Sequence, residues 1–171
     1  MSNHVPTTPG ARGTARLPAI LLVEDNPRDV RLIKEVLAER KLECELRLAR
    51  DGEQALRMLR RQGEYADMVA PDLVLLDINL PILSGIEVLE QIKQDPLLRT
   101  IPVLILSTSA AESDVLQCYA LHANSYLVKP ADFDEFSRMV AEIHAFWIDT
   151  ALPPPAPRMP RTLARPGAVR A

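Results

Sequence analysis

The chain has 171 residues, of which 47% are hydrophobic and 4% aromatic, so it is long enough for one domain with an aliphatic core. Its net charge is −3, with +2 on residues 1–18 and +4 on residues 151–171, which leaves −9 on residues 19–150. This acidic body argues against binding of nucleic acid. No apolar stretch reaches the roughly 18 residues of a membrane span and no signal peptide follows Met1, so we expect a cytoplasmic protein without membrane contact.

The two ends of the chain have compositions that predict little folded structure. Residues 1–18 are rich in Thr, Pro, Gly and Ser, and we expect a disordered tail there. Residues 150–171 contain six prolines and four arginines, which predicts a stiff, extended arm. One folded domain is therefore expected over residues 19–149.

Strand and helix signals alternate five times within that domain. Short aliphatic runs predict the strands, at 20–23, 44–48, 73–76, 102–106 and 125–128. Helical patterns follow each run and should end near residues 40, 62, 94, 122 and 149. Such an alternation predicts an α/β fold with a parallel sheet covered by helices on both faces. The five-stranded solution is the doubly wound (βα)5 flavodoxin-like fold with strand order 2-1-3-4-5, whose ligand site lies at the carboxyl ends of strands 1 and 3.

Capping residues indicate where each helix should begin. Asn26 is a suitable N-cap, because Pro27 would then occupy the first helical position. Pairs with the spacing of a capping box precede the other four helices. These pairs are Asp51 with Gln54, Ser84 with Glu87, Ser109 with Glu112, and Asp132 with Glu135.

Polar side chains able to handle phosphate or metal follow four of the predicted strands. They lie in LLVEDN at 21–26, LLDINLP at 75–81, LILSTS at 104–109 and YLVKP at 126–130. The carboxyl ends of parallel strands meet at one edge of a sheet, so we expect these side chains to converge. The set consists of Glu24, Asp25, Asp77, Ser107 and Lys129.

The chemistry of this set favours phosphoryl transfer. Carboxylates so close together repel one another, and a hard divalent cation such as Mg²⁺ would neutralise them. A carboxylate such as Asp77 can itself act as a nucleophile and form an aspartyl phosphate. Lys129 would offer a point positive charge to a phosphoryl oxygen, and Ser107 would offer a hydroxyl hydrogen bond.

These residues resemble the signature of two-component receiver domains. The likeness runs from about Ile20 to Asp149, and the 30-residue step from Asp77 to Ser107 and the 22-residue step on to Lys129 both suit that family. The resemblance implies that Asp77 is the phosphoacceptor and that Ser107 and Lys129 hold the phosphoryl group.

The resemblance also implies a metal site and a switch. Mg²⁺ would be bound by Asp25, Asp77 and the backbone carbonyl of Asn79, with Glu24 assisting through water. Tyr126 matches the aromatic residue that moves inward when the hydroxyl of Ser107 is recruited. One departure is Thr108, because the family usually has a small residue there. Its β-branched side chain could narrow access to Asp77.

The predicted last helix carries more apolar residues than a small domain easily buries. Apolar side chains recur at steps of three, four, three and four, which is the spacing of a helical packing seam. They are Phe133, Phe136, Val140, Ile143 and Trp147. We interpret Phe136, Val140 and Ile143 as packing on the sheet. We expect Phe146, Trp147, Leu152 and Pro153 to form an arm that packs across a homodimer.

The 22 residues after Asp149 are too few to form an output domain, so we expect a single-domain regulator whose signal is a change in its own surface. The segment LHANSY at 121–126, the Phe146–Trp147 pair and the Leu-Pro-Pro run at 152–154 resemble the small regulators that accompany bacterial phytochromes. This likeness implies a phytochrome-type sensor histidine kinase, or a sensor acting as its phosphatase, as the partner.

Three other functions remain possible on sequence alone. A phosphohydrolase with an aspartyl nucleophile usually has a second acid two residues later, where this chain has Asn79, and it needs a substrate cap for which no chain is left. A phosphorylation-independent interaction module would be favoured only by Thr108. A flavin-binding protein of the same fold would want a Ser/Thr/Gly phosphate loop after the first strand, where this chain has acidic EDNPRD.

Overall fold

Five short parallel strands form one sheet in the order β2-β1-β3-β4-β5, as predicted. The computed structural model describes residues 16–154, and within them the strands lie close to their predicted positions. They are β1 (Ala19–Val23), β2 (Glu45–Ala49), β3 (Leu73–Leu76), β4 (Val103–Ser107) and β5 (Ser125–Val128). The doubly wound flavodoxin-like fold expected from the sequence is confirmed.

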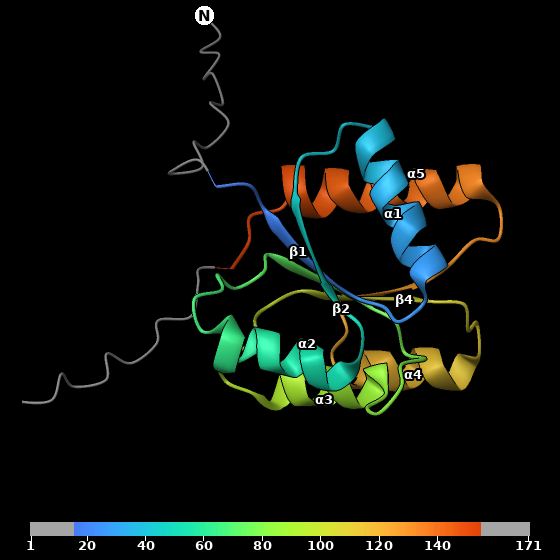
Figure 1. Ribbon diagram of the computed structural model, residues 1–171. Coiled ribbons are helices and arrows are strands. Elements are labelled where there is room, and N and C mark those ends of the chain that lie inside the picture. The colour runs from blue at the N-terminus through green and yellow to red at the C-terminus, as the bar shows by residue number, and fades with distance from the viewer. Residues whose placement is uncertain (1–15, 155–171) are drawn as a thin grey trace, which may run out of the picture.

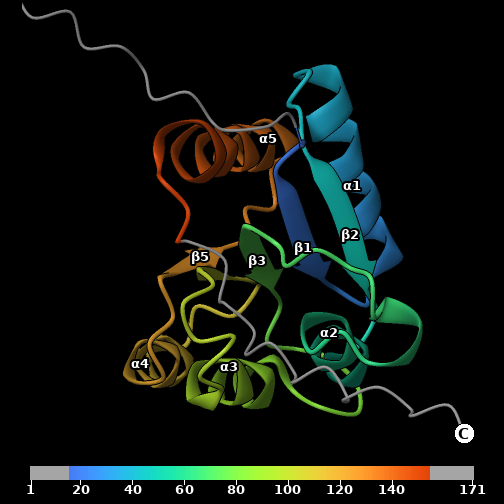
Figure 2. The same ribbon diagram turned by 90° about the vertical axis from the view of Figure 1, so that its left-hand side faces the viewer.

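Helices cover both faces of the sheet (Figure 1). They are α1 (Pro27–Glu39), α2 (Gly52–Leu59), α3 (Gly85–Gln94), α4 (Glu112–Ala120) and α5 (Phe133–Ile143), with a short 3₁₀ turn η1 (Gly63–Tyr65) and a π-helical segment η2 (His144–Thr150). Helices α1 and α5 lie on one face, and α2, α3 and α4 lie on the other (Figure 2).

The alternation of side chains along β1 divides the core into two halves. Leu21 and Val23 pack with residues of α2 and α3, whereas Ile20 and Leu22 pack with residues of α1 and α5. All four side chains are buried. Each such Leu, Ile or Val contributes roughly 1.5–3 kcal/mol through removal of its surface from water, which fixes the sheet between its helical layers.

Two of the predicted helix starts are confirmed in full. The side chain of Asn26 accepts a hydrogen bond from the backbone N–H of Arg28, and Pro27 opens α1. Ser84 and Glu87 form the reciprocal capping box of α3. These two helices follow β1 and β3, so the caps fix the chain directly beyond the ends of those strands.

The predicted boxes of α2 and α5 are confirmed on the N-cap side. The side chain of Asp51 accepts from the backbone N–H of Gln54, and that of Asp132 accepts from the backbone N–H of Glu135. The side chain of Gln54 accepts from the backbone N–H of Arg50 instead of returning to Asp51.

The start of α4 and the end of α2 differ from the prediction. Helix α4 begins after Ala111, and the predicted cap Ser109 donates its hydroxyl to Asp114 at 2.6 Å. The Ser109 hydroxyl oxygen accepts from the backbone N–H of Ala111 at 3.3 Å and not from a backbone N–H inside α4, so the helix has no side-chain cap. Helix α2 ends at Leu59 rather than near residue 62, because Arg61 takes up a left-handed conformation with φ of 54° that closes the helix.

The last helix extends to residue 150, as predicted, but its final turns are π-helical. Phe136, Val140 and Ile143 are buried, which confirms that this stripe packs on the sheet. Trp147 also packs partly against that core, so the domain buries more of it than the sequence pattern predicts. Phe146 is 56% exposed and meets the Trp147 ring edge-on, with 5.3 Å between ring centroids.

The described residues that follow η2 include two exposed apolar side chains. Leu152 is 89% exposed and Pro153 is also exposed. Most of the predicted disordered tail at 1–18 and of the predicted arm at 150–171 lies outside the described residues, so those predictions stay predictions. In the part of the chain that the structure describes, no helix is long and apolar enough to cross a membrane.

Candidate functional site

The ammonium group of Lys129 lies among three carboxylates at the carboxyl edge of the sheet. Its Nζ donates to Glu24 Oε2 at 2.6 Å. It also donates to Asp77 Oδ2 and to Asp29 Oδ2, both at 2.8 Å. An ammonium group has three N–H donors, so all three are used. Lys129 thereby joins the turns after β1, β3 and β5 to the first turn of α1.

This cluster is almost closed to solvent. The side chains of Lys129, Glu24 and Asp77 are 6%, 1% and 8% exposed. Buried charges of this kind are tolerated only when they are paired and hydrogen-bonded. Burial alone would lower the pKa of Lys129, but its hydrogen bonds to Asp29, Asp77 and Glu24 outweigh burial and raise the pKa above 10.5. Lys129 is therefore a permanent positive charge beside Asp77.

Glu24 is the most deeply buried acid of the cluster. Its burial raises the pKa of this carboxyl group above 4.5, and the hydrogen bond from Lys129 opposes that shift. The second oxygen of Glu24 accepts from the backbone N–H of Asn26 at 3.0 Å. Both oxygens thus have donors from the protein, and the side chain is held in one orientation.

The Asp77 carboxylate is held by a backbone N–H as well as by Lys129. Its Oδ1 accepts from the backbone N–H of Asn79 at 3.0 Å, while its Oδ2 faces Lys129. Gly85 packs directly against the Asp77 main chain, and a Cβ at Gly85 would lie 2.0 Å from the Asp77 carbonyl oxygen. The loop after β3 is thus held close to the start of α3.

The remaining predicted residues surround this cluster without joining it. Asp25 is exposed on the turn after β1, and among the described residues its side chain has no hydrogen bond or ion pair. Ser107 is buried, and its hydroxyl accepts from the backbone N–H of Ser109 at 3.1 Å. The Tyr126 hydroxyl donates to the carbonyl oxygen of the same Ser109 at 2.9 Å. Ser107 and Tyr126 therefore both form hydrogen bonds with the backbone of Ser109, in the loop after β4.

Asp29 is the member of the cluster that sequence reasoning missed. It lies in the first turn of α1, where an acid is explained by the helix dipole alone. Asn26 and Pro27 place Asp29 in the turn that follows Asp25, but no local pattern shows that it faces Lys129. With Thr108 and Lys129, Asp29 also lines a hollow at this edge of the sheet.

The donor set suits a hard divalent cation. Glu24, Asp29 and Asp77 together with Lys129 leave a net charge of about −2, and Asp25 beside them adds another negative charge. Within residues 16–154, no group of three or more Asp, Glu, His or Cys side chains is placed to hold a metal ion without other ligands. Mg²⁺ does not need such a group, because it binds proteins through one or two carboxylates and keeps several water ligands.

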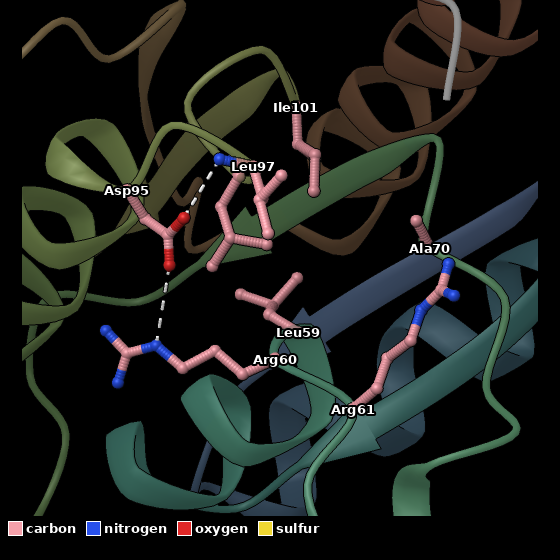
Figure 3. Close-up of a pocket in the computed structure, with 8 residues that line it drawn as sticks. Leu59, Arg60, Arg61, Ala70, Asp95, Leu97 and Ile101 are labelled. Carbon is pink, nitrogen blue, oxygen red and sulfur yellow. Dashed lines mark hydrogen bonds and ion pairs between the residues drawn. The ribbon is translucent and has the colours of Figure 1, made fainter. Parts of the chain in front are cut away.

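A second hollow lies at the opposite edge of the sheet, where the chain enters β3 and β4 (Figure 3). Its lining is mainly aliphatic, from Leu59, Leu97, Leu98 and Ile101, and Arg60 pairs with Asp95 at its rim. Its volume of about 90 Å³ is below the roughly 300 Å³ of small-molecule sites. It holds no cluster of reactive groups, so the carboxyl edge remains the candidate site.

Comparison with known proteins agrees with this geometry. The sequence pattern described as the response regulator receiver domain matches residues 20–141, which is most of the folded part. The chain belongs to the response regulator receiver domain family. The resemblance inferred from the strand-end residues is thereby confirmed, and the relatives are regulators in signalling.

Similar receiver proteins come from phytochrome systems. The response regulator Rcp1 of Synechocystis sp. is 47% identical over 137 residues, covering 80% of this chain and 93% of that protein. The crystal structure of the phosphorylated cyanobacterial phytochrome response regulator RcpA has a TM-score of 0.78 at 46% identity, covering 82% of this chain and 100% of that one. This receiver thus resembles phytochrome response regulators in sequence and in fold.

A divalent cation is known in one of these relatives. The crystal structure of the Mn²⁺-bound form of Rcp1 matches with a TM-score of 0.76 at 46% identity, covering 81% of this chain and 99% of that one. Receiver domains therefore bind divalent metal, which fits the excess negative charge at the carboxyl edge of the present sheet.

Proposed function

We propose that this receiver is switched by phosphorylation of Asp77, with the phosphoryl group taken from a phosphohistidine of a sensor kinase. The observation that carries the proposal is the ammonium of Lys129 at 2.8 Å from a buried Asp77 carboxylate. A carboxylate can act as the nucleophile toward phosphorus, and a fixed positive charge beside it stabilises the oxygens of the transferring group.

The transfer balances as a displacement at phosphorus. An oxygen of Asp77 forms the new P–O bond, and the bond from phosphorus to the kinase histidine nitrogen breaks. The electron pair of that bond remains on the imidazole. Lys129 supplies positive charge to a phosphoryl oxygen, and the backbone N–H of Asn79 keeps the other Asp77 oxygen oriented.

We propose Mg²⁺ as the bound cation, because the site offers carboxylate and carbonyl oxygens. Asp25, Asp77 and the backbone carbonyl of Asn79 would hold it, and when bound it would withdraw negative charge from the phosphoryl group. Glu24 would assist through water, with its two oxygens held in orientation by hydrogen bonds from Lys129 and Asn26. The exposed position of Asp25 would allow exchange of the cation with solvent.

Ser107 and Tyr126 form the proposed switch. The Ser107 hydroxyl would turn from the backbone of Ser109 toward a phosphoryl oxygen on Asp77. That movement would free the loop after β4, whose Ser109 carbonyl now accepts from the Tyr126 hydroxyl. Tyr126 would then move inward, and the surface formed by α4 and β5 would change for a binding partner.

The proposed partner is a phytochrome-type sensor histidine kinase, or such a sensor acting as a phosphatase. Support comes from the phytochrome response regulators that the chain resembles. We also propose a homodimer in which Phe146, Trp147, Leu152 and Pro153 contact the second copy. The exposed ring of Phe146 and the exposed Leu152 support this contact.

The direct test uses a small phosphodonor, so no partner is needed. Incubation with Mg²⁺ and acetyl phosphate should add one phosphoryl group, detected by intact-protein mass spectrometry, and Asp77→Asn should abolish it. Beryllofluoride should bind the wild-type protein in the same Mg²⁺-dependent way. Asp67→Asn is a matched control, because Asp67 is an exposed acid outside the site.

The outcomes separate the competing functions. Loss of the adduct only in Asp77→Asn supports the switch. An adduct that survives in Asp77→Asn would refute Asp77 as the acceptor. No adduct in any variant would favour an interaction module that works without phosphorylation.

A further inference from the structure

We infer that Asp29 is a positioning residue that holds Lys129 in place for phosphoryl transfer at Asp77. This inference rests on the proposed function and adds to it a residue of the first turn of α1. The contact that motivates it is the 2.8 Å hydrogen bond from Lys129 Nζ to Asp29 Oδ2.

The geometry gives Lys129 two anchors that do not react. Of its three carboxylate acceptors, Asp77 is the group that becomes phosphorylated, whereas Glu24 and Asp29 stay unchanged. Two fixed acceptors define the direction of the third N–H far better than one does. With Glu24 alone, the long lysine side chain could rotate about a single contact.

The role of Asp29 becomes larger once Asp77 is esterified. The Asp77 carboxylate then loses its own negative charge, and Lys129 must redirect one N–H to a phosphoryl oxygen. Asp29 and Glu24 keep the ammonium at the site during that change. Without Asp29, one N–H of a lysine whose side chain is 6% exposed would lose its acceptor.

A purely local role for Asp29 does not explain its position. An acid that serves only the helix dipole can point into solvent. Glu35 on the same helix, which pairs with Arg31 at the surface, has 40% of its side chain exposed. The Asp29 side chain is 18% exposed and reaches a residue that is 100 positions away in sequence. It also lines the hollow beside Lys129 and Thr108.

The test compares Asp29→Asn and Asp29→Ala with the wild-type protein over a range of acetyl phosphate concentrations at saturating Mg²⁺. We expect the maximal rate of phosphorylation to fall by on the order of tenfold to a hundredfold, because a misplaced charge costs rate more than binding. The concentration for half-maximal rate should change by less than about threefold. Asp29→Glu should recover a large part of the rate, because it restores a carboxylate acceptor. Glu35→Gln is the control on the same helix.

A second readout does not depend on phosphorylation or on metal. In metal-free protein with ¹⁵N-labelled lysine, the Lys129 ammonium should give a slowly exchanging NMR signal, assigned by its absence in Lys129→Met. That signal should broaden or vanish in Asp29→Ala and persist in Glu35→Gln. Circular dichroism would establish that each variant is folded.

Unchanged rates and an unchanged ammonium signal in folded Asp29→Ala would overturn the inference. Faster phosphorylation of Asp29→Asn would also overturn it, because Asp29 would then withhold Lys129 from the phosphoryl group. Absence of any adduct on the wild-type protein is a separate result that refutes the proposed function. The ammonium signal would still decide whether Asp29 fixes Lys129.

Discussion

Gly85 is needed for the backbone to pass behind Asp77. An added Cβ would lie 2.0 Å from the Asp77 carbonyl oxygen and 2.6 Å from the Ile78 Cα, and neither atom can move without displacing the loop after β3. The Gly85 N–H also donates to the Ile78 carbonyl oxygen at 3.0 Å. Asp77, the proposed phosphoacceptor, is therefore held in place by a close approach of two main-chain segments.

We predict that Gly85→Ala lowers the free energy of unfolding by about 3 kcal/mol or more, because a buried backbone must shift to admit the methyl group. It should also slow phosphorylation of Asp77. Gly63→Ala is the control, since Gly63 has open space around it and a φ of +59°, so it should cost only about 1–2 kcal/mol. Urea denaturation measures both. Equal losses in the two variants would contradict the close-approach argument.

Three of the four clustered site residues could be predicted from sequence. Glu24, Asp77 and Lys129 each follow an aliphatic run, and a parallel sheet brings such strand ends to one edge. Asp29 could not be predicted, because an acid in a first helical turn has a sufficient local explanation in the helix dipole. Its contact with Lys129 depends on the packing of distant segments.

Helix caps differ in how far a local pattern determines them. Ser84 and Glu87 form the predicted box, whereas the Ser109 hydroxyl donates to Asp114 and α4 begins after Ala111 without a side-chain cap. The end of α2 could not be predicted from the sequence either, because an arginine seldom takes up the left-handed conformation that Arg61 has.

We predict that Ser84→Ala lowers the free energy of unfolding by about 1 kcal/mol, because α3 loses the side chain that caps the backbone N–H of Glu87. Ser113→Ala, at an exposed position inside α4, should change stability by less than about 0.5 kcal/mol. Thermal and urea unfolding would measure both. A loss no larger for Ser84 than for Ser113 would show that the box contributes little.

At the scale of the whole molecule, the strand order and the two helical layers were predictable from the alternation of strands and helices. The packing of α5 was harder to predict from the sequence. The apolar stripe on α5 has a spacing that suits packing on the sheet as well as packing on a second chain. The structure assigns Phe136, Val140 and Ile143 to the sheet, with Trp147 partly beside them.

We predict that Phe146→Ala combined with Leu152→Ala weakens a homodimer at least tenfold, because both exposed side chains would lose their apolar contact with the second copy. Sedimentation equilibrium would measure the dissociation constant. These changes are preferable to truncation after Ile143, which would also remove the buried His144 and Ile148 and so disturb the domain itself. Leu17→Ala, another exposed apolar residue, is the control. An unchanged dissociation constant in the double variant would reject the arm.

The position of Trp147 has a spectroscopic consequence. It is the single tryptophan of the chain, and it lies on the extension of α5, which runs away from the edge that carries Asp77. Its indole stands edge-on against Phe146, so emission from this ring should change if the proposed homodimer forms through Phe146.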